Sequence, residues 1–157
     1  MDSLKEILIG THAFLGEAGA LAFLWVTIEL LANTENGMRR TRIAARLGTA
    51  FIFLSWIIGG YYYVKFYGQI KPFIKEGPQP WAHGIITETK EHIFLFLPIV
   101  ALLTTGIIQR FKNELLTNKS ARTATIILSI LLVLMVFTIA GFGFLISSGY
   151  RAATAIM

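Results

Sequence analysis

The sequence predicts an all-α integral membrane protein that folds as a single four-helix transmembrane bundle over residues 1–157. The chain is 55% hydrophobic and only 15% charged, whereas a soluble domain carries about a quarter charged residues. Its mean hydropathy is +0.65. The hydrophobic residues form four runs, each of at least the roughly 20 residues that cross a bilayer. Cysteine is absent, which excludes thiolate zinc sites, iron–sulfur clusters, covalently attached haem c and disulfides.

The four runs set the expected helices. No small-residue cleavage site follows a short apolar core near the N-terminus, so we expect the first helix to be retained rather than removed as a signal peptide. Each later run is separated from the previous one by a polar segment that serves as a loop. The expected helices cover residues of about 8–32, 43–66, 81–109 and 123–148.

A faint internal repeat suggests that the four helices form two pseudo-symmetric helical hairpins. An offset of 71 aligns His12 with His83 and Glu17 with Glu88. If the hairpins are related by an axis along the membrane normal, the aligned residues lie at matching depths.

The distribution of basic residues predicts the orientation. Segments 33–46 and 110–122 together hold eight of the 14 Lys and Arg residues, and parity places both segments on the same side. The positive-inside rule assigns that side to the cytoplasm and both termini to the outside. The net charge of +5 is thereby explained without a nucleic-acid partner.

Six titratable residues are expected to converge near the outer ends of the first and third helices. Glu17 is the most informative, because a lone carboxylate inside an apolar run costs about 2.5–3.5 kcal/mol or more to insert. It should face the bundle or have a cationic partner, such as a metal ion or Lys90. The six candidates are His12, Glu17, His83, Glu88, Glu91 and His92.

The leading hypothesis is a metal site built from five of these residues, with His83 as a further candidate ligand. Glu88 and His92 are four residues apart and share a helical face, with Glu91 to one side. Inward carboxylates and histidines hold metals in helix bundles. Nitrogen and oxygen ligands suit Fe, Cu, Zn or Mn without choosing among them. Such a site would serve redox chemistry or metal handling, so the chain would be a metal-dependent oxidoreductase, or a subunit of one.

Two other hypotheses stay open. In the first, His12 and His83 are axial ligands of haem b in an electron-transfer subunit, with a quinone site as a variant. In the second, the chain is a non-catalytic subunit whose polar groups join helices within a larger membrane complex or a homo-oligomer. A plainer structural interpretation also exists: if the third span begins near Lys90, His83 and Glu88 are simply solvated.

Two further features are predicted to be structural. Glu29 lies near the inner end of the first helix, where Arg39 or Arg40 can neutralise it. The glycines at 59–60 and at 141 and 143 are expected to be points of close helix packing.

Overall fold

The structure is a computed structural model that describes residues 2–155. Within this range the chain forms helices and no strands. Four helical runs are long and apolar enough to cross a membrane, which confirms the expected number. The first, second and fourth are longer than hydropathy alone predicts, and the third is shifted by one residue from the expected 81–109. The runs are Ser3–Ala32, Glu35–Glu76, Ala82–Arg110 and Lys119–Thr154.

The second and third runs each consist of more than one helical element. The second run contains a π-helical segment, and the third begins with one, so both depart from regular α-helix at the same end of the molecule. A short helix between the third and fourth runs was not expected. In chain order the elements are α1 (Asp2–Ala32), α2 (Glu35–Tyr62), η1 (Tyr63–Tyr67), α3 (Gly68–Glu76), η2 (Ala82–Thr87), α4 (Glu88–Arg110), α5 (Lys112–Thr117) and α6 (Lys119–Thr154).

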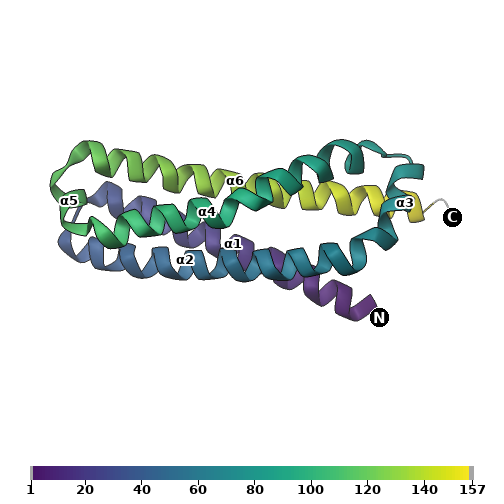
Figure 1. Ribbon diagram of the computed structural model, residues 1–157, viewed down its shortest axis with the longest axis horizontal. Helices are drawn as coiled ribbons and strands as arrows, with labels where there is room; N and C mark the ends of the chain where they lie inside the picture. The colour runs from purple at the N-terminus through teal and green to yellow at the C-terminus, as the bar shows by residue number, and fades with distance from the viewer. Residues whose placement is uncertain (1, 156–157) are drawn as a thin grey trace.

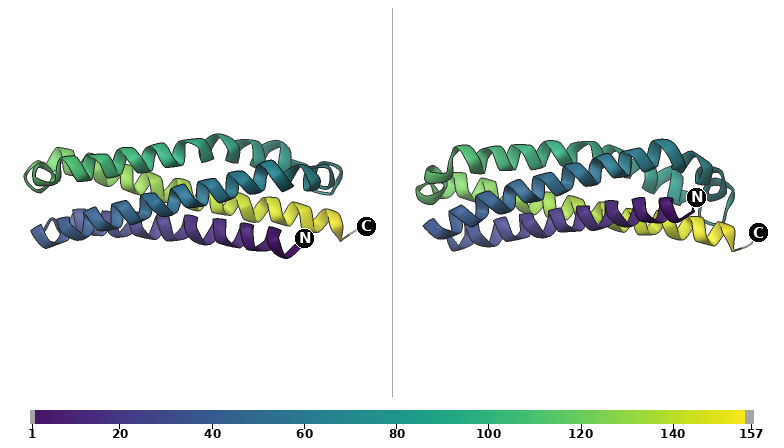
Figure 2. Two further views of the ribbon diagram at one scale, coloured as in Figure 1. Left: turned by 60° about the horizontal axis from the view of Figure 1, so that its bottom comes forward. Right: turned by 90° about the horizontal axis from the view of Figure 1, so that it is seen from below.

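The long helices lie side by side along one axis (Figures 1 and 2). α1 packs against α2 and α6, and α4 packs against the same two helices. The four therefore form a ring in which α1 lies diagonally opposite α4. Short connections between neighbours make it an up-down-up-down bundle.

The bundle has two distinct ends, both visible in Figure 1. The terminal end carries the N-terminus, the C-terminus and α3. The basic end carries the α1–α2 connection and α5. The eight basic residues of segments 33–46 and 110–122 belong to this basic end: Arg39, Arg40, Arg42, Arg46, Arg110, Lys112, Lys119 and Arg122.

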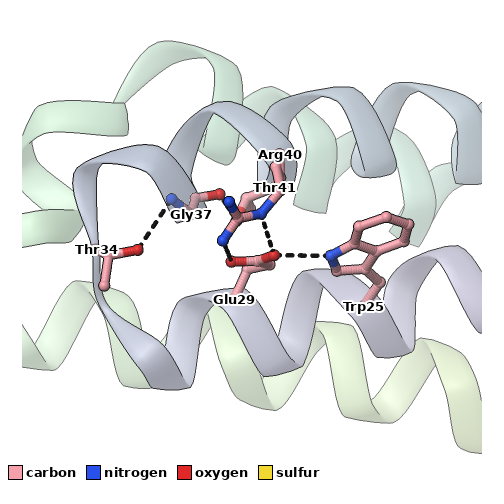
Figure 3. Close-up of polar contacts among 6 residues, drawn as sticks. All are labelled: Trp25, Glu29, Thr34, Gly37, Arg40 and Thr41. Atoms are coloured by element: carbon pink, nitrogen blue, oxygen red, sulfur yellow. Dashed lines mark hydrogen bonds and ion pairs between the residues drawn. The ribbon is translucent and has the colours of Figure 1, made fainter.

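The α1–α2 connection is fixed by a buried carboxylate (Figure 3). The Arg40 guanidinium donates two hydrogen bonds to Glu29, and the Trp25 indole donates a third at 2.8 Å. This confirms the neutralisation of Glu29 expected from the sequence. Thr34 caps α2 by accepting a bond of 3.0 Å from the Gly37 amide. A Cβ at Gly37 would lie 2.7 Å from Glu29 Oε2 and 2.7 Å from the Thr34 hydroxyl, so a larger residue there would displace these groups.

Small residues let α1 and α2 approach closely. A Cβ at Gly19 would lie 2.8 Å from Ile52, and one at Gly48 would lie 2.9 Å from Phe23. Such contacts are typical of helix pairs in membranes, where close backbone packing replaces the hydrophobic driving force.

Two apolar cores stabilise the bundle. The larger occupies the middle and the half nearer the basic end, and includes the fully buried Phe23, Leu30 and Ile108. The smaller lies at the terminal end, where Tyr67, Ile74 and Ala82 pack against α6. The larger core thins out toward the terminal end, where α1, α2, α4 and α6 enclose a cavity.

Candidate functional site

A cavity of about 340 Å³ lies among the four long helices, in the half of the bundle that leads to the terminal end. Most of its lining is apolar, from side chains such as Leu97, Val136 and Ile139. Its polar and charged lining residues are His12, Glu17, Ser55, Trp56, Lys90, Ser147 and Arg151.

Three aromatic rings form one wall of the cavity. Phe94 of α4 lies between the other two. The Trp56 indole stacks on it with ring centroids 6.0 Å apart and planes 23° apart, and the His12 ring meets its edge at 6.2 Å. Both are favourable aromatic arrangements. They hold groups from α1, α2 and α4 in fixed positions.

Contacts with Ser55 define how His12 can act. His12 Nδ1 lies 2.8 Å from the Ser55 carbonyl oxygen and 3.0 Å from the Ser55 hydroxyl. That hydroxyl already donates to the His12 carbonyl at 2.8 Å. Nδ1 therefore faces acceptors and carries the ring proton. In the neutral ring Nε2 is then an acceptor, and no described residue bonds to it. Because Gly59 has no side chain, the His12 ring can pack against it; a Cβ at Gly59 would lie 2.5 Å from His12 Nδ1.

The hydrogen-bond donors at the cavity include the Trp56 indole N–H and the Lys90 ammonium, neither of which bonds to any of residues 2–155. The Trp56 indole N–H is buried and makes no hydrogen bond. An unsatisfied buried donor costs about 1–3 kcal/mol. Lys90 is partly buried, and its ammonium reaches across to α6, where a Cβ at Gly143 would lie 3.2 Å away. The one ion pair of the described chain joins Arg40 to Glu29, so Lys90 is not neutralised by a carboxylate.

Glu17 and Arg151 lie at the rim of the cavity. Both line it and both are exposed. Arg151 lies over the Phe144 ring, 6.0 Å from its centroid. The sequence pairs Glu17 with Lys90 as a possible ion pair. The structure places both at one cavity but not within ion-pair distance of each other.

The turn from Glu88 to His92 faces away from the cavity except at Lys90. Glu88 and His92 are exposed, and His92 Nδ1 donates to the Glu88 carbonyl at 2.7 Å. Glu91 accepts a short hydrogen bond from the Tyr63 hydroxyl of η1. The α4 residues that line the cavity are Lys90, Phe94 and Leu97.

His83 belongs to a separate network at the terminal end. The Tyr67 hydroxyl lies 2.9 Å from His83 Nδ1 and 2.9 Å from the Thr87 hydroxyl. The Thr87 hydroxyl in turn donates to the Ala82 carbonyl at 2.9 Å. Tyr67, His83 and Thr87 are all buried. They come from η1 and η2, so the two π-helical segments meet in this network. π-Helical turns often occur at functional sites.

The structure thus places His12 and His83 at different depths rather than at the matching depths of the suggested repeat. His12 lies beside Phe94. His83 precedes Phe94 by eleven residues in one continuous helical run, or roughly 16 Å at 1.5 Å per residue.

The six candidate ligands divide among three places. His12 and Glu17 line the cavity, His83 belongs to the buried network, and Glu88, Glu91 and His92 lie on the outside of α4 or at its edge. Within residues 2–155, no three His, Asp or Glu side chains are grouped closely enough to hold a metal ion. The metal and haem hypotheses remain predictions, and the cavity is the better-formed candidate site.

Comparison with known proteins adds no relative. No family model, curated protein or solved structure matches the chain. The function is therefore argued from the cavity itself.

Sequence reasoning missed several residues that line the cavity. Ser55, Trp56 and Phe94 look like ordinary members of apolar runs, and only the packing of α2 against α4 brings them together. One feature of the sequence could have indicated Trp56 and Phe94. Both are aromatic residues in the interior of their apolar runs, whereas Trp and Tyr in membrane proteins are enriched at the two membrane–water interfaces.

Proposed function

We propose that this chain is a multi-pass membrane protein whose cavity binds a membrane-soluble ring molecule of the quinone class. The four runs span the bilayer, with the basic end in the cytoplasm and both termini outside. Supporting this placement, large apolar side chains cover the outside of the bundle: Ile28, Val64, Ile99 and Leu134 are 58%, 78%, 61% and 59% exposed. An apolar surface of this extent suits lipid rather than water.

The unpartnered Lys90 ammonium carries the proposal for the ligand. Lys90 lines the cavity without a carboxylate partner, so a ligand oxygen there would accept its hydrogen bonds. His12 Nε2 supplies an acceptor for a ligand hydroxyl. A quinone carbonyl accepts hydrogen bonds and its reduced hydroxyl donates them, so the two forms of one molecule match both kinds of group.

The shape and polarity of the cavity favour the same class. Ligand cavities hold about 300–1,000 Å³, and at about 340 Å³ this one suits a single substituted ring. Phe94 and Trp56 offer aromatic faces. A quinone reaches such a site through the bilayer, and its apolar tail can stay there.

A fluorescence titration tests this proposal. The full chain in lipid nanodiscs is titrated with a short-chain benzoquinone or naphthoquinone while tryptophan emission is recorded. We expect saturable quenching that Trp56→Phe abolishes and that Trp81→Phe, at an exposed tryptophan, leaves in place. Lys90→Met should weaken binding about tenfold or more, because a hydrogen bond to a charged group contributes about 1.5–3 kcal/mol.

The matched control is Lys71→Met, which removes an exposed lysine at the same end of the bundle. It should leave the affinity unchanged. Quenching that rises linearly without saturation, or that Lys90→Met does not alter, would overturn the proposal. Binding of a long-chain carboxylate in place of the quinone would keep the cavity as a ligand site but contradict the quinone class.

A further inference from the structure

A second hollow, of about 230 Å³, lies at the basic end between α2 and the segment that begins α5. Three cations line it: Arg39 and Arg42 from α2, and Lys112 from α5. Glu35 is the only carboxylate in its lining, and Met38 and Leu116 supply apolar surface. The hollow therefore carries a net charge of about plus two.

These cations keep free donors. Arg40 is the arginine that neutralises Glu29, and no other ion pair forms among residues 2–155. Arg42 uses only its Nε, which donates to Gln109 at 3.0 Å. Arg39 and Lys112 are exposed and make no hydrogen bond with any described residue. These donors therefore line one hollow without forming an ion pair to Glu35, the carboxylate in its lining.

We propose that this hollow binds the phosphate group of an anionic lipid. Arginine binds phosphate with two parallel hydrogen bonds, and lysine adds a point charge. Basic pockets at the ends of membrane-spanning helices hold anionic lipid headgroups in this way. The inference rests on the membrane placement proposed above and is independent of the quinone.

The surface next to the hollow favours a lipid over free phosphate. Ile43 and Leu47 follow Arg39 at intervals of four residues, so they continue the same face of α2 toward the middle of the bundle. They are 50% and 51% exposed. A phosphate at Arg39 therefore places its acyl chains along an apolar strip.

Thermal unfolding of the delipidated full chain in detergent tests the inference. Phosphatidylglycerol, phosphatidylcholine with the same acyl chains, and inorganic phosphate are titrated separately. We expect phosphatidylglycerol to raise the apparent Tm saturably, and the other two to raise it by less than half as much. Arg39→Gln with Lys112→Gln should remove most of the rise. Lys71→Gln with Lys75→Gln makes the same charge change at exposed terminal-end lysines and should keep it.

Each other outcome contradicts the inference. Equal shifts with both lipids, or a shift that survives Arg39→Gln with Lys112→Gln, show that no anionic-lipid site exists. An equal shift with inorganic phosphate shows a site for free phosphate instead. Failure of the membrane placement is recognised separately, because the chain would then leave the membrane fraction on alkaline extraction. Failure of the quinone proposal leaves the lipid titration unaffected.

Discussion

Gly59 shows how a single residue shapes the cavity. It faces the His12 ring, while its neighbour Gly60 has nothing within 4 Å of the place where a Cβ would stand. Replacing Gly59 by alanine should push the ring away and break its hydrogen bond to Ser55. We expect a loss of about 1–3 kcal/mol from overpacking, seen as a lower Tm, together with weaker quinone binding.

Gly60→Ala is the matched control. Alanine is favoured over glycine in a helix by up to about 1 kcal/mol, so this variant should be as stable as the original chain or more stable. Equal unfolding temperatures for the two alanine variants would show that His12 is not held as described.

Lys90 shows that the type of a residue can mark it as a functional candidate without predicting its neighbours. A lysine within a predicted membrane span is a functional candidate wherever it occurs, and the sequence singled it out only as a partner for Glu17. Its role at the cavity depends on Trp56 and Gly143, which are distant in the sequence. No pattern local to Lys90 predicts those neighbours.

At the scale of elements, α4 shows why the fold was predictable and its inward face was not. Spanning length and hydropathy locate the helix, because about 20 apolar residues are a strong signal. Its orientation is harder, since side chains facing lipid are as apolar as those facing the core. Leu95 and Phe96 are 57% and 59% exposed, while Leu97 is buried. The sequence analysis placed the polar turn at 88–92 on the inward face of this helix, whereas Glu88 and His92 are exposed.

The π-helical segments η1 and η2 were not predicted either. A regular period of 3.6 residues fails across them, so face assignments for residues before Glu88 do not carry over from α4. Their common network around Tyr67 provides a test. Tyr67→Phe removes the hydroxyl between His83 and Thr87 and should cost about 1–3 kcal/mol.

The comparison variant for that network is Tyr61→Phe. Tyr61 is 50% exposed, and no described residue bonds to its hydroxyl, so its loss should leave the Tm unchanged. Thermal unfolding in detergent measures both variants. A Tyr67→Phe protein as stable as the Tyr61→Phe protein would show that the network contributes nothing.

At the scale of the whole molecule, the bundle puts the α1–α2 connection and α5, which belong to the two predicted cytoplasmic segments, at the same end (Figure 1). Parity and short loops made this predictable from the sequence. The chain has no cysteine, so single cysteines report on each end without background. With intact cells, an impermeant maleimide should label Ser3→Cys but should label Ser120→Cys only after the membrane is opened. The reverse pattern would contradict the proposed orientation.

Photolabelling gives the sharpest test of the cavity as a quinone site. A photoreactive quinone is activated in membranes containing the full chain, and the adducts are located by mass spectrometry. We expect them on cavity residues, chiefly Trp56, Lys90 and Phe94, and we expect an excess of unlabelled quinone to suppress them. Adducts spread over outward-facing residues such as Leu134 and Phe137, and not reduced by the competitor, would show that quinones only dissolve in the surrounding lipid.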